Sequence, residues 1–133
     1  MIDEASAQRL RATPVAWLTT VRADGQPQSS YVWFDFDGED IVMLSQPKTP
    51  KVRNIEGNPK VALNLDGNTA TGDGVLTMEA TAEIVGTMSG DRWDAYIAKY
   101  GDRIANGPWG TPDAFNDMFS LAIRLVPGRV RAW

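Results

Sequence analysis

The chain has 133 residues, and its 17 acidic and 13 basic residues give a formal net charge of −4 at pH 7. This acidic balance argues against nucleic acid or a membrane surface as the main partner. The chain contains no cysteine and no histidine, which excludes disulfides, thiolate nucleophiles, cysteine-based metal sites and Ser-His-Asp catalysis. Because the commonest general base is missing, an enzyme built on this sequence needs a cofactor for its difficult chemistry.

The length predicts one domain over residues 1–133. The first residues, Met-Ile-Asp-Glu, lack the apolar segment of a signal peptide. No apolar run approaches the length of a membrane span. We therefore expect a cytoplasmic protein without a membrane partner.

The N-terminal half changes from a helical to a strand pattern. Residues 2–12 predict a short amphipathic helix, and three strands are predicted at residues 15–21, 28–36 and 41–45. An Asp-Gly pair at residues 24–25 is typical of a tight hairpin turn between the first two strands. These signals indicate consecutive antiparallel strands.

The second predicted strand separates its side chains onto two faces. Val32, Phe34 and Phe36 share one face, and Tyr31 and Trp33 share the other. Aromatic residues in strands usually pack, so Trp33 is equally compatible with packing and with contact to a bound ring. Four nearby carboxylates are interpreted as a solvated hairpin rather than a catalytic pair: Asp35, Asp37, Glu39 and Asp40.

The most informative segment covers residues 45–54, which contain no acidic residue in an otherwise acidic chain. Thr49 is a good N-cap, and Pro50 suits the first position of a short helix. A helix N-terminus offers unpaired N–H groups and a partial positive charge, which favour a bound phosphate. The segment adds three cations, namely Lys48, Lys51 and Arg53. We interpret it as a phosphate site; the alternatives are a solvated helix start and, for Arg53, a bracing role.

The C-terminal half predicts further strands and two helices. The strands lie at residues 60–65, 75–85, 121–126 and 129–133. The small polar residues 68–74 indicate a loop. Ser89 is a candidate cap for a helix over residues 91–100, and a Thr-Pro pair at residues 111–112 opens another short helix. Residues 101–113 are rich in glycine and proline, so we expect them to be irregular.

The order of these elements predicts the fold class. Six to seven strands in mostly hairpin order, with inserted helices, indicate a mainly β protein, an antiparallel Greek-key barrel. There is no βαβ alternation, and the glycines match neither the dinucleotide fingerprint nor the P-loop. A doubly wound nucleotide-binding sheet is therefore not expected.

Five short segments, taken in order, resemble a known family, the flavin-reductase-like split β-barrels related to pyridoxamine 5′-phosphate oxidase. The segments are residues 16–20, 24–28, 32–34, 51–55 and 58–61. Within that superfamily the chain is most similar to the actinobacterial branch that uses the deazaflavin coenzyme F420. The resemblance is strongest from about residue 13 to residue 85.

The resemblance implies an FMN-binding-like split barrel that forms a homodimer with two cofactor sites at the subunit interface. It places the cofactor phosphate on Lys51 and Asn54, which match the family motif most directly, with further contacts from the same loop: Ser45, Lys48, Thr49 and Arg53. It places the redox ring along the second strand, near Gln28, Ser30, Val32 and Trp33. It also implies a contact from the partner subunit through Gly72, Asp73 and Gly74. No catalytic side chain and no metal ligand are implied.

The implied activity is hydride transfer between F420 and a small organic substrate. Three alternatives remain: an FMN-dependent oxidase or reductase, a cofactor-binding protein without turnover, and an interaction module whose basic loop meets an acidic partner. Pyridoxamine phosphate oxidation itself is not expected, because the Arg and His pair of those enzymes is absent from a chain without histidine. The aromatic residues of the C-terminal half favour the core or a dimer interface over a substrate pocket: Trp93, Tyr96, Trp109 and Phe115.

Overall fold

A computed structural model describes residues 2–68, 70–88 and 90–133 of the chain. Within these residues, seven antiparallel strands form one sheet with the order β2-β1-β5-β6-β7-β4-β3. The strands are β1 (Val15–Val21), β2 (Pro27–Trp33), β3 (Asp35–Phe36), β4 (Ile41–Ser45), β5 (Lys60–Leu65), β6 (Leu76–Gly86) and β7 (Leu121–Ala132). The helices are α1 (Glu4–Ala12), α2 (Pro50–Gly57), α3 (Gly90–Ala105) and α4 (Pro112–Met118). The mainly β class and the antiparallel order are as predicted.

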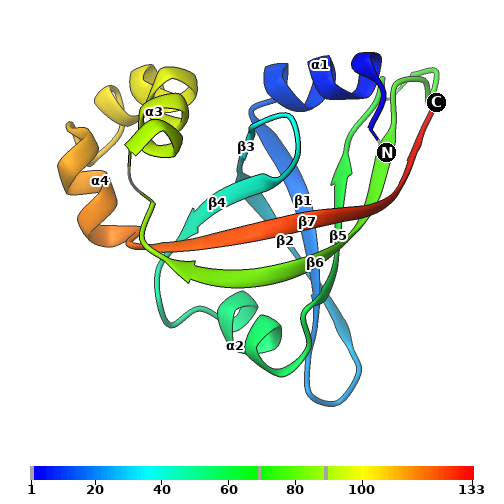
Figure 1. The fold of residues 1–133 in the computed structure, drawn as a ribbon, viewed down its shortest axis with the longest axis horizontal. Helices are drawn as coiled ribbons and strands as arrows, with labels where there is room; N and C mark the ends of the chain where they lie inside the picture. Colours follow the sequence, from blue (N-terminus) through cyan, green and yellow to red (C-terminus); the bar gives the residue numbers. More distant parts are fainter. Residues whose placement is uncertain (1, 69, 89) are drawn as a thin grey trace.

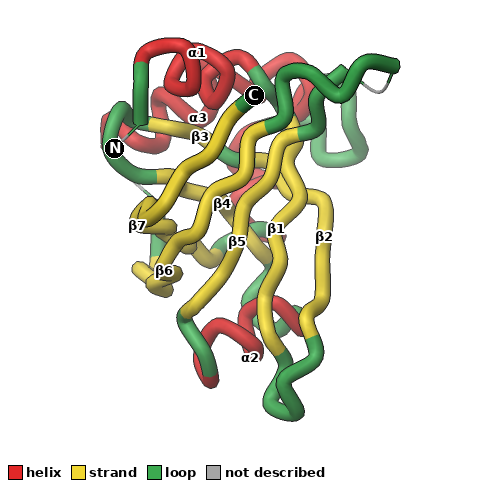
Figure 2. Tube along the Cα trace, turned by 90° about the vertical axis from the view of Figure 1, so that its right-hand side faces the viewer, coloured by secondary structure: helices red, strands yellow, loops and turns green. Residues whose placement is uncertain are grey.

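The sheet is curled into a half-barrel, and the helices lie around its rim (Figures 1 and 2). Helix α1 lies at one end of the barrel and α2 at the opposite end, while α3 and α4 lie together at one side (Figure 1). The curl brings β2 close to β4, although these strands are far apart in the strand order. The end of the barrel that carries α2 is therefore framed by both β2 and β4.

Strand β4 is buried on both of its faces. Ile41 and Met43 belong to the apolar cluster enclosed by the sheet. Val42 and Leu44 belong to a second cluster, which β4 forms with α3 and α4. A continuous apolar run is typical of a strand that is covered on both sides, and β4 thereby joins the barrel core to the layer of α3 and α4.

The strand predicted over residues 28–36 is divided at Phe34 into β2 and β3. The Phe34 N–H donates to the Tyr100 hydroxyl at 2.7 Å. The Phe34 carbonyl accepts from the Lys99 ammonium at 2.8 Å and lies 2.6 Å from the same Tyr100 hydroxyl. Because side chains of α3 take up both backbone groups, Phe34 needs no neighbouring strand there. The prediction of one strand is wrong for this physical reason.

Asp35 is buried, at 8% exposed, where the sequence predicted a solvated hairpin. It belongs to β3 and lies close enough to Lys99 to favour the charged form of that amine. Burial outweighs this attraction and lowers the pKa of Lys99 to about 8. The other predicted carboxylates, from Asp37 to Asp40, are more exposed and surround the β3–β4 turn.

Two elements are longer than predicted. Helix α3 continues to Ala105, through residues expected to be irregular, because Ile104 is fully buried in the apolar cluster shared by β4, α3 and α4, and one glycine is tolerated in a helix. Strand β7 is continuous, where two strands were expected. Its Pro127 lies opposite Ala80, next to a register shift in the pairing of β6 and β7. Proline has no N–H group to donate, and a strand tolerates it at such a bulge, so the strand continues through Pro127.

The remaining elements follow their sequence signals closely. Helix α4 begins at Pro112 of the predicted Thr-Pro pair, and the Thr111 hydroxyl, as the N-cap, accepts a hydrogen bond from the Ala114 N–H. The proposed cap at Ser89 lies outside the described residues. None of the helices in the described ranges is long and apolar enough to cross a membrane.

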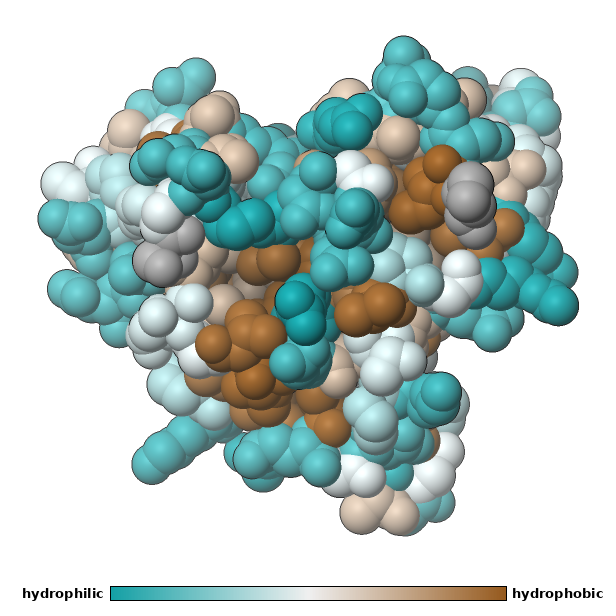
Figure 3. Space-filling model, viewed as in Figure 1, coloured by the Kyte–Doolittle hydropathy of each residue, from teal (hydrophilic) through white to brown (hydrophobic). Residues whose placement is uncertain are grey.

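Apolar side chains also reach the surface. They gather in the middle of the face shown in Figure 3, surrounded by polar residues. Exposed apolar side chains include Val85 of β6 and Val126 of β7. On the β1–β2 hairpin, Trp17 and Tyr31 stand opposite each other with ring centroids 4.6 Å apart, and they are 40% and 57% exposed.

We predict that Tyr100→Phe lowers the free energy of unfolding by about 1–3 kcal/mol, because the buried Phe34 N–H and the Pro14 carbonyl both lose the Tyr100 hydroxyl as their partner. Urea denaturation measures the change. The matched control is Tyr96→Phe, since Tyr96 is equally buried on the same helix but its hydroxyl forms no hydrogen bond within the described residues. Equal effects of the two substitutions would contradict the bracing role of Tyr100.

Candidate functional site: a groove at the start of helix α2

Three adjoining hollows surround the start of α2. The hairpin groove, of about 960 Å³, lies between the β1–β2 turn and α2 and includes Arg22, Asp24 and Arg53. The clamp pocket, of about 240 Å³, is polar and is lined by Thr20, Gln28, Ser29, Ser30, Thr49, Pro50, Lys51 and Asn54. The aromatic recess, of about 320 Å³, is lined by residues of β2, β4, α3 and α4 together with Thr49 and Lys51. Because neighbouring hollows share lining residues, they form one continuous depression across the helix start.

The first turn of α2 has N–H groups available to a ligand. Thr49 has the extended backbone of an N-cap, but its side chain makes no cap hydrogen bond. Its hydroxyl lies instead 3.2 Å from the Ser45 hydroxyl, which donates to the Gln46 carbonyl. The N–H groups of Lys51 and Val52 consequently have no acceptor in the described part of the chain. Such groups favour an anion.

Lys51 adds a cation at the same place. Its side chain is half-buried, and this burial holds the pKa of its amine below its usual range. Within the described ranges, no carboxylate lies at ion-pair distance from Lys51, whereas Arg22 and Arg92 each have one. A half-buried cation without a counter-ion is stabilised by a bound anion.

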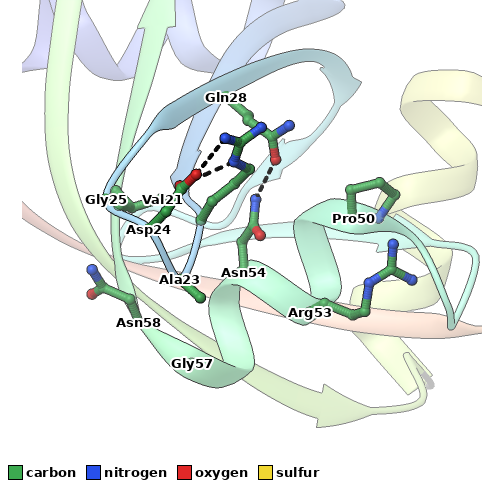
Figure 4. Close-up of a pocket in the computed structure, with 11 residues that line it drawn as sticks. Val21, Ala23, Asp24, Gly25, Gln28, Pro50, Arg53, Asn54, Gly57 and Asn58 are labelled. Carbon is green, nitrogen blue, oxygen red and sulfur yellow. Dashed lines mark hydrogen bonds and ion pairs between the residues drawn. The ribbon is translucent and has the colours of Figure 1, made fainter.

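Asn54 holds α2 against the hairpin. Its amide nitrogen donates to the Thr20 hydroxyl and to the Gln28 amide oxygen, both at 2.9 Å. Figure 4 shows the Asn54 side chain pointing from α2 towards Gln28 on β2. Because an amide has two N–H donors and both are used, Asn54 has no donor left for a phosphate. In this arrangement Asn54 positions the site, and the amide nitrogen of Gln28 has no acceptor among residues 2–68, 70–88 and 90–133.

The hydrogen bonds of Asn54 to the hairpin also determine the direction of Lys51, which lies three residues earlier in the helix. Residues three apart in a helix lie on the same side. When Asn54 is bonded to the hairpin, Lys51 faces the clamp pocket beside it. Arg53 lies off this side; in Figure 4 its side chain extends away from the hairpin, and it donates to the Lys48 carbonyl at 3.0 Å. Arg53 therefore braces the loop, and Lys48 is exposed and lines none of the three hollows.

The residues assigned to the ring divide between two hollows. Gln28 and Ser30 line the clamp pocket, while Val32 and Trp33 line the aromatic recess. Trp33 is also a packing residue, since its ring is parallel to Tyr100 at 4.8 Å and to Phe115 at 5.6 Å. Ser45 lies at the edge of the recess, next to Gln46.

The glycine-rich loop is far from these hollows within the chain. Gly72, Asp73 and Gly74 lie between β5 and β6, at the end of the barrel opposite α2 (Figure 1). The Gly74 N–H donates to the carbonyl of Trp133 at the C-terminus. A contact from this loop to the cofactor of a partner subunit stays a prediction.

Sequence reasoning missed several lining residues. Thr20 was predictable, because the tight Asp-Gly turn pairs it directly with Gln28 across the hairpin. Leu44, Gln46 and Phe119 meet in the recess only through the packing of α3 and α4 against β4. No local pattern in the sequence predicts that these three residues lie close together.

Comparisons with solved structures find this fold in other proteins. A structure named F420 reductase is 31% identical to this chain, covers 98% of each chain and superposes with a TM-score of 0.73. HutZ, a heme storage protein from Vibrio cholerae, is 25% identical over 99% of this chain and 95% of its own, with a TM-score of 0.71. A putative pyridoxamine 5′-phosphate oxidase from Listeria innocua is 23% identical over 90% of this chain and 87% of its own, with a TM-score of 0.63.

Among curated proteins, none matches the chain. The sequence profile of one family, described as pyridoxamine 5′-phosphate oxidase, matches residues 2–133. Its match extends over the barrel, the groove and the helices α3 and α4. The chain therefore belongs to the pyridoxamine 5′-phosphate oxidase family and has the split β-barrel of that family.

Proposed function

We propose that this protein is an F420-dependent oxidoreductase that transfers a hydride between the deazaflavin and a small organic substrate. The family supports an oxidoreductase, and the similar structure named F420 reductase supports the deazaflavin. The observation that carries the proposal is the half-buried Lys51 beside free N–H groups at the start of α2, next to an aromatic recess. When bound, the deazaflavin supplies the hydride chemistry.

The residues of the clamp pocket fit a ribityl phosphate. Lys51, the first N–H groups of α2 and the amide nitrogen of Gln28 are all donors, and the pocket holds no carboxylate. A hydrogen bond to a charged group is worth about 1.5–3 kcal/mol, so a few such contacts anchor a phosphate. Asn54 and Thr20 keep these donors in place. The remaining work of the chain is orientation, which hydride transfer needs more than a protein base.

FMN is the alternative cofactor, since it presents the same ribityl phosphate to the same donors. A side-by-side titration of the apoprotein with F420 and FMN decides between them, and saturable binding of neither would refute both. Haem is less well supported, although HutZ is a similar structure. This chain has neither histidine nor cysteine, two of the commonest axial ligands of haem iron.

We predict that Lys51→Met weakens F420 binding at least about tenfold, which corresponds to about 1.4 kcal/mol, because the phosphate loses its half-buried partner. F420 fluorescence quenching measures the dissociation constant. The control is Lys48→Met, which removes the same charge from an exposed position outside the three hollows. If both variants bind F420 as wild type does, the phosphate does not lie at the start of α2.

We predict that Asn54→Ala lowers the free energy of unfolding by about 1–2 kcal/mol, since Thr20 and Gln28 lose their shared donor. Cofactor affinity should also fall, because Lys51 is no longer held on the groove side. Glu56→Ala on the exposed side of α2 is the stability control and should change it by less than about 0.5 kcal/mol. A stability loss without any loss of affinity would separate Asn54 from the site.

We further propose a homodimer, as the resemblance implies, with the β1–β2 hairpin in the interface. The exposed Trp17–Tyr31 pair adjoins the depression, and Tyr31 itself lines the aromatic recess. A second copy that covers this aromatic pair would also close the site from that side. Aromatic residues of this kind are enriched in interfaces.

We predict that Trp17→Glu shifts the protein from dimer to monomer, because the charge loses its water in such an interface. Light scattering at several concentrations measures the mass, and circular dichroism checks that the barrel is retained. The control is Met118→Glu, which places the same charge at an exposed apolar residue at the end of α4, outside the β1–β2 hairpin. A wild-type protein that is monomeric at every concentration would refute the proposed dimer.

A further inference from the structure

The aromatic recess differs in chemistry from the clamp pocket beside it. The clamp pocket is lined almost wholly by polar residues. The recess has a mainly aromatic and apolar wall from β2, β4, α3 and α4, which includes Tyr96, and a polar edge that runs from Ser45 to Lys51. Its volume of about 320 Å³ is near the lower end for ligand pockets and is about ten times the volume of one water molecule. A molecule of two or three fused rings fills such a space.

The wall of the recess is made of stacked rings. Phe115 is nearly parallel to Trp33 at 5.6 Å and to Phe119 at 4.7 Å. Behind them, Trp109 meets Phe115 edge-on at 5.0 Å and Phe119 edge-on at 5.7 Å. Trp33 and Phe119 are only partly buried, so their rings are accessible from the recess. A rigid wall of this kind favours a flat, apolar ring.

One polar group of the wall has no partner. Tyr96 lines the recess and is 1% exposed, yet its hydroxyl makes no hydrogen bond within the described residues. Burial holds the pKa of Tyr96 far above its usual range, so the hydroxyl stays protonated and is a hydrogen-bond donor. A bound molecule with an acceptor atom would satisfy it.

We propose that the aromatic recess is the substrate site and that its substrate is a planar, mainly apolar ring system bearing an acceptor such as a carbonyl, which accepts from the Tyr96 hydroxyl. This inference rests on the proposed function for the cofactor that lies beside it. Thr49 and Lys51 line both the recess and the clamp pocket, so a ring in the recess adjoins whatever the clamp holds. Tyr96 then contacts the substrate directly, and the ring of Phe119 favours a planar substrate because it can stack on it.

Binding of the neutral fluorophore Prodan tests the proposal, because Prodan is a naphthalene ring with a carbonyl and its emission shifts to the blue in an apolar site. Titration of the apoprotein should show saturable, blue-shifted binding. Phe119→Ala should weaken it at least about fivefold through lost ring contact. The control Val126→Ala removes an exposed apolar side chain of β7 that lines none of the three hollows, and it should leave binding unchanged. Absence of saturable binding, or equal effects of both substitutions, would overturn the proposal.

The role of Tyr96 needs a second probe. Tyr96→Phe keeps the ring and removes the donor, so it should weaken Prodan binding about three- to tenfold. It should leave unchanged the binding of 2-(dimethylamino)naphthalene, which lacks the carbonyl. Equal losses for both probes, or no loss for Prodan, would remove Tyr96 from substrate recognition.

Repeating the Prodan titration with saturating F420 distinguishes the two possible occupants. Prodan that still binds places the substrate beside the cofactor, as proposed. Competitive displacement by F420 would mean that the recess holds the cofactor ring itself, which overturns the proposal. If F420 fails to bind in its own titration, the cofactor assignment fails, while Prodan binding to the apoprotein still reports on the recess alone.

Discussion

The start of helix α2 depends on the hydrogen bonds of one amide side chain. Asn54 donates to Thr20 and Gln28, which lie opposite each other on neighbouring strands. Val52 and Ile55 bury one face of the helix against the barrel and so set its approximate rotation. The amide bonds are directional, and they turn Lys51 and the free N–H groups of the first turn towards one pocket. The pairing of β1 with β2 places Thr20 opposite Gln28, and these two residues hold Asn54, so the anion site depends on the register of the hairpin.

Charge pairing elsewhere in the chain makes this anion site selective. Arg22, Arg92 and Arg124 each lie within ion-pair distance of a carboxylate. Lys51, like exposed cations such as Lys48, has no such partner in the described ranges, but unlike Lys48 it is partly withdrawn from water. An acidic protein repels polyanions at long range, while one half-buried cation still attracts a single phosphate at short range. The net charge of −4 and the clamp are therefore compatible.

The sequence predicted best where the determining contacts are local. The hairpin at Asp24, the N-terminal signals of α2 and α4, and the strand over residues 60–65 were all recoverable from neighbouring residues. Sequence-based prediction failed where a side chain far away in the sequence determines where a strand or helix ends. The break at Phe34 needs Tyr100, which lies 66 positions away, and the extension of α3 needs burial of Ile104. The bracing role of Asn54 needs the register of the hairpin, and the recess needs the packing of α3 and α4 on β4.

The division between α2 and the α3–α4 layer separates the two proposed binding tasks. The clamp depends on the hairpin and α2, whereas the wall of the recess depends on side chains that α3 and α4 bring to β4. Trp33 connects them, because it lies on the strand of Gln28 and its ring is parallel to Tyr100. Tyr100 also holds the backbone of Phe34, so α3 determines the end of the strand that lines both hollows. Substitutions on α4 can then reshape the recess alone, while changes at Tyr100 disturb the clamp as well.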